Sequence, residues 1–370
     1  MRIERISLRA VRLRLTEPFR ISSGETFHRR ILLLSMDTDA ATGNAECVAG
    51  EAPNYSYETN ETARWALENW LIPAVLGLDF QQPAQVAAAL ESAARGHKMA
   101  KAAIEMAAWD ASARARGESL AHALGGDRAR VPAGVSIGLQ PDRTTLFRRI
   151  RQFVEEGYQR VKLKIAPGHD VNVVRAVRKE FPDLPLTVDA NAAYVADDLE
   201  RLCELDGLGL LLIEQPFAED DLLLHAELQR RIETPVCLDE SITSPARCRE
   251  AIALQAGRMV NIKPGRVGGH GSSLAIHDLC REAGWPVWIG GMLESGIGRA
   301  HNVALASLPN VLLPGDTSAS RRYWERDVVQ PEFTLNDDGT VSVPTAPGIG
   351  VGVDEAFLEE IEESRREFVA

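Results

Sequence analysis

Residues 160–165 read "RVKLKI", a stretch in which charged and apolar side chains alternate. In a β-strand this alternation places Lys162 and Lys164 on one face and the apolar side chains on the other. A buried lysine costs several kcal/mol unless it is paired with an opposite charge or loses its proton. If the lysine face points into a closed barrel, carboxylates must therefore lie opposite it.

Eight short segments of this kind follow one another through the middle of the chain. Each is apolar, ends in a polar residue and is followed by a stretch long enough for a helix. Eight such units in series predict a parallel β/α barrel rather than an open sheet. In chain order the segments read "VPAGVSIG", "RVKLKI", "LPLTVDAN", "LLLIEQP", "PVCLDES", "MVNIKP", "PVWIGG" and "VLLPGD".

The N-terminal part has a different pattern. Residues 1–50 are typical of an antiparallel meander, with strands expected in "RISLRAVRLRL", "RRILLLSMDTD" and "GNAECVAG". Apolar residues at helical spacing then predict helices over residues 57–76 and 83–124. Gly125 and Gly126 interrupt this pattern, and we place a domain boundary there.

The C-terminal part returns to turn-rich β texture from residue 321 onward. Asp338-Gly339 lies between "PEFTLN" and "TVSVP" and predicts a β-hairpin. We expect this tail to pack back on the N-terminal meander. The predicted domains are residues 1–126 for an α+β domain, residues 127–320 for the barrel, and residues 321–370 for the returning segment.

The composition is that of a globular protein. Of the 370 residues, 45% are hydrophobic and 25% charged, and 41 basic against 53 acidic residues give a net charge of −12. This acidic balance disfavours a nucleic-acid partner, and no apolar run approaches the roughly 20 residues of a membrane span. The five cysteines are scattered without a CxxC pair and the N-terminus lacks a signal-peptide pattern, so we expect a reduced, cytoplasmic protein.

The polar residues at the ends of five consecutive predicted strands recur at a nearly constant interval. Successive separations are 25, 25, 25 and 24 positions for Lys164, Asp189, Glu214, Asp239 and Lys263. One β/α unit has about that length, because roughly 250 residues of a barrel are divided among eight units. Each side chain is thus expected at the C-terminal end of its strand, where barrel enzymes place their active sites.

Three carboxylates at one rim repel one another, and a divalent cation removes that repulsion. Mg²⁺, or another divalent metal such as Mn²⁺, prefers oxygen ligands, so we predict Asp189, Glu214 and Asp239 as metal ligands. Lys164 and Lys263 come from the strands before and after them and would flank the metal. One acidic residue after a strand is often a helix N-cap or an ion-pair partner, but three at equal spacing between two lysines favour a metal site.

This combination suits removal of a proton next to a carboxylate. A cation that binds a substrate carboxylate acidifies its α-proton. A lysine whose pKa is lowered by burial and by neighbouring cations can take that proton near neutral pH. Lys162 would supply such a cation beside Lys164, although it could also be a structural ion-pair residue.

Three further residues are predicted to support the metal and the lysines. Asn191 would orient Asp189 or the metal shell. Glu240 follows Asp239 and faces the other side of a regular strand, so we interpret it as a supporting group rather than a ligand. Arg266 lies in a glycine-rich loop after a catalytic strand, where it would supply a second cation to the pocket rather than a plain surface charge.

The motifs around these residues resemble the enolase superfamily, in its muconate-lactonising subgroup. In chain order they are the KxK of "RVKLKI", "DAN" at Asp189, "EQP" at Glu214, "DES" at Asp239 and "NIKPGRVGG" at Lys263. A lysine or histidine base combined with Mg²⁺ is the known pattern of this superfamily. The resemblance covers essentially the whole chain and implies a (β/α)7β modified TIM barrel, with an α+β N-terminal capping domain that the C-terminal segment completes.

Within the subgroup, the chain is most similar to the branch of o-succinylbenzoate synthases and N-succinylamino acid (N-acylamino acid) racemases. This likeness implies Mg²⁺-dependent removal of an α-proton, with dehydration of 2-succinyl-6-hydroxy-2,4-cyclohexadiene-1-carboxylate in menaquinone biosynthesis and racemisation as a further activity. One departure is "GNAECV", where relatives usually carry an aromatic residue before the Glu-Cys pair. The likeness rests on "ECVAGEAPNYSYET", "RGHKMAKAAIEMAAWD", "GVSIG", "GGMLESGIGRAHNVALASLPN", "PGDTSASRRYWERDVV" and "VPTAPGIGVGVD".

The resemblance also implies roles for single residues. Lys164 would be the base, Lys263 its partner on the opposite face, and Lys162 would lie near the substrate carboxylate. Loops over residues 19–24 and 53–57 would cover a pocket for a small carboxylate substrate, with no nucleic-acid or membrane partner and with a homo-oligomeric assembly. The pocket would be lined by Phe19, Tyr55, Ser136, Gly291, Met292 and Leu293, of which the first two could equally be interdomain core.

Several other functions are compatible with part of this pattern, and some of them need the same catalytic groups. Racemisation of N-acylamino acids could be the main activity, and a muconate-type cycloisomerase or a dipeptide epimerase would need the same groups, although "GGMLESGIG" does not resemble the epimerase motif. A non-catalytic metal-binding protein would not require two flanking lysines. A dinucleotide-dependent dehydrogenase is disfavoured because no G-x-G-x-x-G follows a first strand.

Overall fold

The barrel predicted in the middle of the chain is present. The computed structural model describes residues 1–21 and 24–370. Within them, a parallel sheet of seven strands runs from β5 to β11, and each strand lies beside the next one in the chain. The strands are β5 (Gly134–Ile137), β6 (Arg160–Lys164), β7 (Leu186–Asp189), β8 (Ile213–Glu214), β9 (Val236–Leu238), β10 (Met259–Ile262) and β11 (Val287–Ile289).

The eighth predicted segment closes this sheet into a barrel without forming a regular strand. Val311 makes a parallel bridge with β11, and Gly315 makes one with Ala133, directly before β5. The backbone N–H of Asp316 donates to the carbonyl of Ile289 at 3.0 Å. The closing segment therefore joins the first and last strands, as a (β/α)7β barrel requires.

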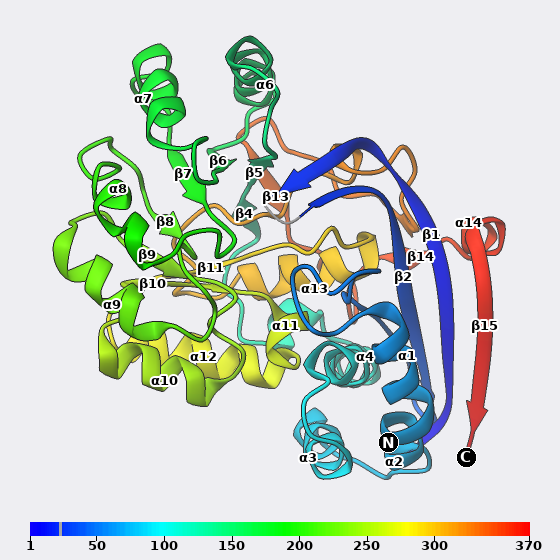
Figure 1. Cartoon of the computed structure of the whole chain (residues 1–370). Helices are drawn as coiled ribbons and strands as arrows, with labels where there is room; N and C mark the ends of the chain where they lie inside the picture. The colour runs from blue at the N-terminus through cyan, green and yellow to red at the C-terminus, as the bar shows by residue number, and fades with distance from the viewer. Residues whose placement is uncertain (22–23) are drawn as a thin grey trace.

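Helices surround the barrel on its outside (Figure 1). Side-chain oxygens of Asp142, Asp221, Ser244 and Ser295 accept from backbone N–H groups at the starts of α6, α9, α10 and α13, which is the usual way to begin a helix. The helices are α6 (Arg143–Glu155), α7 (Val171–Glu180), a 3-10 turn (Ala196–Asp198) with α8 (Leu199–Cys203), α9 (Leu222–Arg231), α10 (Pro245–Leu254), α11 (Pro264–Val267), α12 (His270–Glu282) and α13 (Gly296–Ala306).

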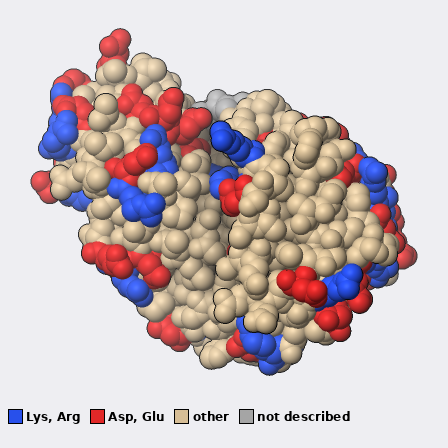
Figure 2. Space-filling model, turned by 90° about the horizontal axis from the view of Figure 1, so that it is seen from below, with Lys and Arg blue, Asp and Glu red and all other residues tan. Residues whose placement is uncertain are grey.

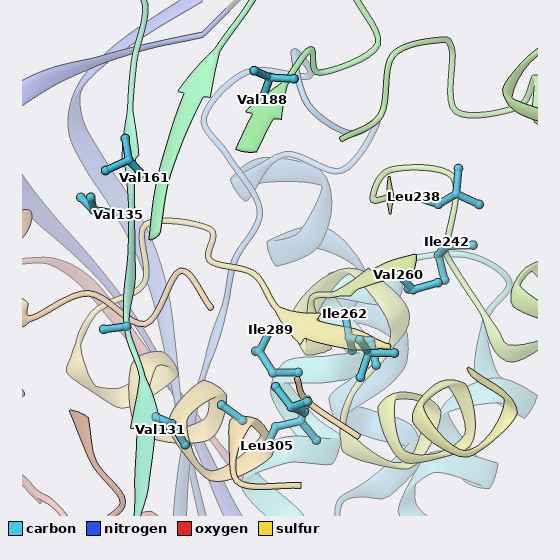
Figure 3. Close-up of a cluster of buried hydrophobic side chains, with 14 of the residues drawn as sticks. Val131, Val135, Val161, Val188, Leu238, Ile242, Val260, Ile262, Ile289 and Leu305 are labelled. Atoms are coloured by element: carbon cyan, nitrogen blue, oxygen red, sulfur yellow. The ribbon is translucent and has the colours of Figure 1, made fainter. Parts of the chain in front are cut away.

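Strand alternation divides the barrel side chains into an outer apolar layer and an inner layer. On β6, Val161 and Leu163 belong to the main apolar core, whereas Lys162 and Lys164 contact carboxylates of other strands inside the barrel, as predicted. Figure 3 shows residues of the outer layer around the ring of strands: Val135, Val161, Val188, Leu238, Val260 and Ile289. The inner layer has a separate small apolar cluster of Leu212, Cys237, Met259 and Trp288. Leu212 and Cys237 lie two residues before the strand-end residues Glu214 and Asp239, and Met259 lies four before Lys263.

The capping domain is built on an antiparallel sheet (Figure 1). In the described residues its strand order is β15-β1-β2-β3. The C-terminal strand pairs with β1 along the outer edge, so the tail packs on the meander as predicted. The strands are β1 (Ile3–Ile21), β2 (Gly24–Thr38), β3 (Thr42–Cys47) and β15 (Glu362–Val369).

The two helical stretches predicted for the capping domain are each divided. Gly96 and His97 have φ values of 68° and 51° and Gly117 has 69°, the left-handed conformation that ends helices, so the region 83–124 forms α3 (Pro83–Ala93), α4 (Lys98–Ala115) and α5 (Leu120–Ala123). The earlier stretch begins at Asn60 and consists of α1 (Asn60–Ala66), a π-helical turn (Leu67–Leu71) and α2 (Ile72–Val75).

The hairpin predicted at Asp338-Gly339 is wrong in its strand partner. A turn is present, since the N–H of Gly339 donates to the carbonyl of Asn336 at 2.9 Å. However, the pairing ends at the turn: the N–H of Asn336 donates to the carbonyl of Thr340 at 2.8 Å, but "PEFTLN" forms no strand, and the carbonyl of Phe333 accepts from Ser320 at 2.8 Å. Instead, β13 (Thr340–Ser342) pairs with β4 (Arg130–Pro132).

The rest of the C-terminal segment contains a 3-10 turn (Ser320–Arg322), the antiparallel pair β12 (Val329–Gln330) and β14 (Gly352–Val353), and α14 (Glu355–Ile361). The segment thus pairs with β4 through β13 and with the capping sheet through β15. The domain limits at residues 126 and 320 stay predictions.

Two buried carboxylates of the capping domain bind the N-termini of barrel helices. Glu105 on α4 accepts from the first two backbone N–H groups of α12 at 2.8 and 2.9 Å. Glu46 on β3 accepts from the backbone N–H groups of Ser295 and Gly298, at the start of α13, both at 3.1 Å. Because a helix N-terminus carries unpaired N–H groups and partial positive charge, these contacts hold the capping domain on the barrel.

Charged side chains of both signs mix on the surface. Figure 2 shows acidic and basic side chains beside one another on the face seen from below, and a broad central area without them. This face therefore carries no field of a single sign. None of the helices in the described residues is long and apolar enough to cross a membrane.

Glu46 predicts how the stability of the fold depends on pH. Burial, together with the nearby Glu294, raises the pKa of Glu46 from 4.5 to about 8. Such a carboxyl stabilises the fold fully below its unfolded pKa, and this contribution is lost as the pH rises through the folded pKa. Between about pH 6 and about pH 9, we expect the unfolding free energy of the wild type, relative to Glu46→Gln, to fall by about 1 to 3 kcal/mol.

Denaturant unfolding of both proteins at both pH values measures this difference. Glu155→Gln, which changes an exposed glutamate on α6, is the matched control and should show no such dependence. A difference between wild type and Glu46→Gln that stays constant with pH would contradict the prediction.

Candidate active site

Five predicted residues lie at or just beyond the C-terminal ends of consecutive barrel strands. Lys164, Asp189 and Glu214 are the last residues of β6, β7 and β8, and Asp239 and Lys263 directly follow β9 and β10. All five side chains are buried, with exposed fractions between 0% and 9%. The strand-end spacing therefore places five charged groups inside the mouth of the barrel.

The strand register places the three carboxylates at two heights. Asp189 pairs with Lys164 on one side and with Glu214 on the other. Glu214 pairs with Cys237, so Asp239 lies two residues farther along its strand. Because barrel strands are staggered, equal spacing in the sequence does not give equal height in the barrel.

Lys162 and Lys164 bind the first two carboxylates. Lys164 Nζ lies 2.5 Å from Asp189 Oδ2. Lys162 Nζ lies 3.0 Å from Glu214 Oε2 and 3.4 Å from Asp189 Oδ2, and its third partner is Asp316 Oδ2 at 2.7 Å. The two lysines of "RVKLKI" thus have the opposite charges that their burial requires.

Lys263 and Arg266 bind the third carboxylate. Lys263 Nζ donates to Asp239 Oδ2 at 2.8 Å, and Arg266 Nη1 donates to Asp239 Oδ1. The hydroxyl of Tyr55, from the capping domain, accepts from Lys263 Nζ at 3.0 Å and from Arg266 Nη1 at 2.9 Å. Arg266 is therefore not a surface charge. It belongs, together with Lys162 and the five strand-end residues, to a buried cluster of charges that we call the polar site.

Asn191 connects Lys164 with a fourth carboxylate. Its Oδ1 accepts from Lys164 Nζ at 2.6 Å, and its Nδ2 donates to Glu240 Oε1 at 2.9 Å. Its backbone N–H donates to Asp189 Oδ1 at 3.0 Å. The expectation that Glu240 faces away from the site is wrong, because β9 ends at Leu238 and alternation no longer fixes the side chains beyond it.

The neighbours of Lys263 raise its pKa, whereas burial alone would lower it. Tyr55 and two nearby glutamates outweigh burial, so the pKa of Lys263 lies above its ordinary value. The same holds for Lys162, where three carboxylates outweigh burial. Conversely, burial raises the pKa of Asp189, but the neighbouring lysines lower it to about 2. The carboxylates thus keep these lysines protonated, and the lysines keep Asp189 ionised.

A cavity of about 400 Å³ lies between the capping domain and the mouth of the barrel. Lys164, Asn191 and Lys263 reach its wall from the barrel. The predicted pocket residues on its wall are Phe19, Tyr55, Gly291, Met292 and Leu293. Phe19 also packs against the main apolar core, and Tyr55 packs against the apolar core of the capping domain. Each of these two residues therefore lines the pocket and also contributes to a core, the two roles that the sequence left open.

Two expectations for the pocket have a different outcome. Ser136 is buried on β5, level with Lys162, and is not among the described residues of the cavity wall. The predicted loop 19–24 contributes Phe19 and Gly24 to the wall, whereas its residues 22–23 lie outside the described part of the chain.

Two inward-facing residues belong to the polar site although the spacing argument does not select them. Asn261 Nδ2 donates to Glu214 Oε1 at 2.7 Å. It lies two residues before Lys263, so strand alternation could have identified it. Asp316 contacts Lys162 and ends the eighth predicted segment, so the rule used for the other strand ends applies to it as well.

The three predicted metal ligands suit a divalent cation by their chemistry. They are carboxylates, 0–1% exposed, from consecutive strands, and Mg²⁺ prefers such oxygen ligands. In residues 1–21 and 24–370, however, no three Asp, Glu, His or Cys side chains are grouped closely enough to hold an ion. The carboxylates bind Lys162, Lys164, Lys263 and Arg266 instead, so ion binding would require them to exchange these partners. The assignment of the ligands stays a prediction.

Comparison with protein families agrees with this architecture. Residues 4–125 match the mandelate racemase / muconate lactonizing enzyme N-terminal domain, and residues 145–357 match the enolase C-terminal domain-like family. The chain belongs to the enolase superfamily. The resemblance read from the strand-end motifs is thereby confirmed, and members of this superfamily depend on a divalent metal.

Similar members of the enolase superfamily span nearly the whole chain. The chain is 49% identical over 359 residues to an o-succinylbenzoate synthase of Geobacillus stearothermophilus, covering 96% of this chain and 95% of that one. It is 49% identical over 362 residues to an N-succinylamino acid racemase of Amycolatopsis, covering 98% of both. The crystal structure of a superfamily member from Listeria innocua has a TM-score of 0.96 at 40% identity and covers 99% of both chains.

From the hydrogen bonds of Tyr55 we predict that the capping domain contributes to the reaction and does not only enclose the cavity. Tyr55→Phe removes a hydroxyl that accepts from two cations of the site. Because hydrogen bonds to charged groups are worth about 1.5 to 3 kcal/mol, we expect kcat/KM to fall about 10- to 100-fold. Steady-state kinetics measures this, with thermal unfolding to verify the fold.

Tyr158→Phe is the matched control, since Tyr158 is a buried tyrosine that lies before β6 at the opposite end of the barrel. Its kcat/KM should stay within about twofold of the wild type. If Tyr55→Phe behaves like this control, the hydroxyl has no part in the reaction.

Proposed function

We propose that the protein removes the proton next to a substrate carboxylate, and that its main reaction dehydrates 2-succinyl-6-hydroxy-2,4-cyclohexadiene-1-carboxylate to o-succinylbenzoate, a step of menaquinone biosynthesis. The observation that carries the proposal is that Lys164 and Lys263 line one cavity beside buried carboxylates. The relatives named o-succinylbenzoate synthase and N-succinylamino acid racemase, each 49% identical, support it.

In the dehydration, Lys164 as a neutral amine takes the proton α to the carboxylate. The electron pair of the broken C–H bond forms the new ring double bond while the C–O bond to the β-hydroxyl breaks. The hydroxyl leaves as water with the proton that Lys164 returns, so the proton and electron count balances. Lys263 stays protonated, and its charge stabilises the negative charge that develops on the substrate.

A divalent ion, Mg²⁺ or Mn²⁺, held by Asp189, Glu214 and Asp239 would stabilise that negative charge on the carboxylate oxygens when bound. Lys162, which is fully buried among carboxylates, would add a fixed positive charge near the substrate carboxylate. Tyr55 would orient Lys263 from the capping side.

The second candidate is racemisation of N-succinylamino acids, as an additional or main activity. It is favoured by the presence of two lysines, and not one, on the wall of the cavity. Lys164 would take the α-proton from one face while Lys263 gives a proton to the other, and the roles would exchange for the opposite enantiomer. Both reactions share the removal of the α-proton, which is the difficult step.

We also propose a cytoplasmic location and a homo-oligomeric state. The five cysteines, all within the described residues, form no disulfide, which is typical of a reducing compartment. Trp65 and Trp70 are each about half exposed, with ring centroids 6.3 Å apart. Aromatic residues of this kind, and surface areas poor in charge such as the centre of Figure 2, are common where subunits meet.

Lys263→Ala tests the two-lysine scheme. We expect racemisation to be lost by at least about 1,000-fold, because one face of the α-carbon then has no proton carrier. Exchange of the α-proton in deuterated water should persist for the single enantiomer whose proton faces Lys164. Polarimetry and proton NMR measure the two outcomes.

Two variants control this experiment. Lys263→Arg keeps the charge but cannot act as a base, so it should retain more dehydration than Lys263→Ala while racemisation stays lost. Lys179→Ala changes an exposed lysine on α7 and should leave both activities intact. Racemisation that survives in Lys263→Ala would show that the two-lysine scheme is wrong.

Removal of the metal tests the class of reaction. After treatment with a chelator and desalting, we expect α-proton exchange and dehydration to be lost, since nothing else in the site replaces a divalent charge at the substrate carboxylate. Addition of Mg²⁺ or Mn²⁺ should restore both. Full activity in protein whose metal content has been shown by elemental analysis to be negligible would exclude a metal-dependent mechanism.

A further inference from the structure

Lys162 is shared between two groups of carboxylates with different roles. Two of its three partners, Glu214 and Asp189, are predicted metal ligands and lie 3.0 and 3.4 Å from its Nζ. The third partner, Asp316, makes the shortest contact at 2.7 Å and comes from the segment that closes the barrel. The side chain of Lys162 is only 2% exposed, so these carboxylates and not bulk water surround its ammonium group.

Asp316 is itself held firmly in place. Arg160 Nη2 donates to Asp316 Oδ1 at 3.0 Å and to the carbonyl of Pro314 at 2.7 Å. Gly134 leaves room for Arg160 in this position. A Cβ at residue 134 would fall 2.5 Å from the Arg160 guanidinium carbon, so any other side chain there would collide with it. The backbone of Asp316 is fixed as well, by the hydrogen bond of its N–H to β11.

The aromatic ring of Trp288 completes the surroundings of Lys162. The Lys162 ammonium lies 4.7 Å from the ring centroid, and the Arg160 guanidinium lies 5.1 Å from it. Both cations therefore lie against Trp288 and Asp316, and neither of these two residues is on the described cavity wall.

We infer that Asp316 is a positioning residue that draws Lys162 away from Asp189 and Glu214 and so keeps these two carboxylates available to a divalent cation. A lysine ammonium and a metal ion compete for the same carboxylate oxygens. Where Asp316 binds Lys162, part of the lysine charge is compensated and the competition weakens. The inference rests on the proposed metal site and adds a residue that controls its affinity.

The test measures ion affinity on metal-free protein without substrate. Isothermal titration calorimetry with Mn²⁺, followed by Mg²⁺, gives the dissociation constant for wild type and for Asp316→Asn. We expect Asp316→Asn to raise the dissociation constant about 10- to 100-fold, the usual effect of losing a group that supports metal ligands, because Lys162 then falls back on Asp189 and Glu214.

A double-mutant cycle separates action through Lys162 from a general loss of negative charge. Lys162→Met removes the competing ammonium and should lower the dissociation constant. In the Lys162→Met background, Asp316→Asn should change it by less than about threefold. If Asp316→Asn weakens metal binding equally with and without Lys162, the Asp316 charge acts on the ion by direct electrostatic attraction. That result would overturn the positioning role.

Asp170→Asn is the matched control, because Asp170 is a buried aspartate paired with an arginine, Arg201, at 2.8 Å outside the polar site. The dissociation constant of the Asp170→Asn variant for Mn²⁺ and Mg²⁺ should equal that of the wild type. Thermal unfolding verifies each variant. If Asp316→Asn does not fold, Asp316→Ser, which also removes the carboxylate, takes its place, and an affinity within about twofold of the wild type would overturn the inference.

The outcomes for the proposed function and for this inference are distinct. If the wild type itself binds neither ion, the metal site and the proposed reaction fail together. If the wild type binds an ion and Asp316→Asn binds it equally well, only the role of Asp316 fails.

Discussion

The structure depends on compensating each positive charge inside the barrel by a carboxylate from a neighbouring strand. Moving one ion from water into a medium of low polarity costs on the order of 20 kcal/mol in the idealised case. Lys162 and Lys164 therefore could not occupy the inner face of β6 without Asp189 and Glu214 on the next two strands. The charges that serve the chemistry also specify which strands must be neighbours.

The barrel and the capping domain contribute different parts of the site. Barrel strands supply the lysines and carboxylates, whereas the capping domain supplies most of the remaining cavity wall and the hydroxyl of Tyr55. Glu46 and Glu105 bind the starts of α13 and α12, so the same contacts that join the domains also fix the loop that leads from β11 to α13. Met292 and Leu293 in that loop face the cavity.

Sequence spacing predicted the strand ends well because one β/α unit has a nearly constant length. The spacing did not predict the height of each side chain along the barrel axis. Because the strands are staggered, Asp239 lies two residues beyond the level at which Asp189 and Glu214 pair. Alternation failed for Glu240 for a related reason, because it applies only while the strand continues. Asp316 could be found only by applying the strand-end rule to a segment that closes the barrel through two isolated bridges.

Charges of opposite sign are closely matched inside the barrel. Within the described residues, Lys162, Lys164, Lys263, Arg160 and Arg266 face an equal number of carboxylates, namely Asp189, Glu214, Asp239, Glu240 and Asp316. A divalent cation together with a substrate carboxylate adds one net positive charge to this balanced set. In a buried site such an excess disfavours the charged form of an amine, which is the direction that the proposed role of Lys164 as a base requires.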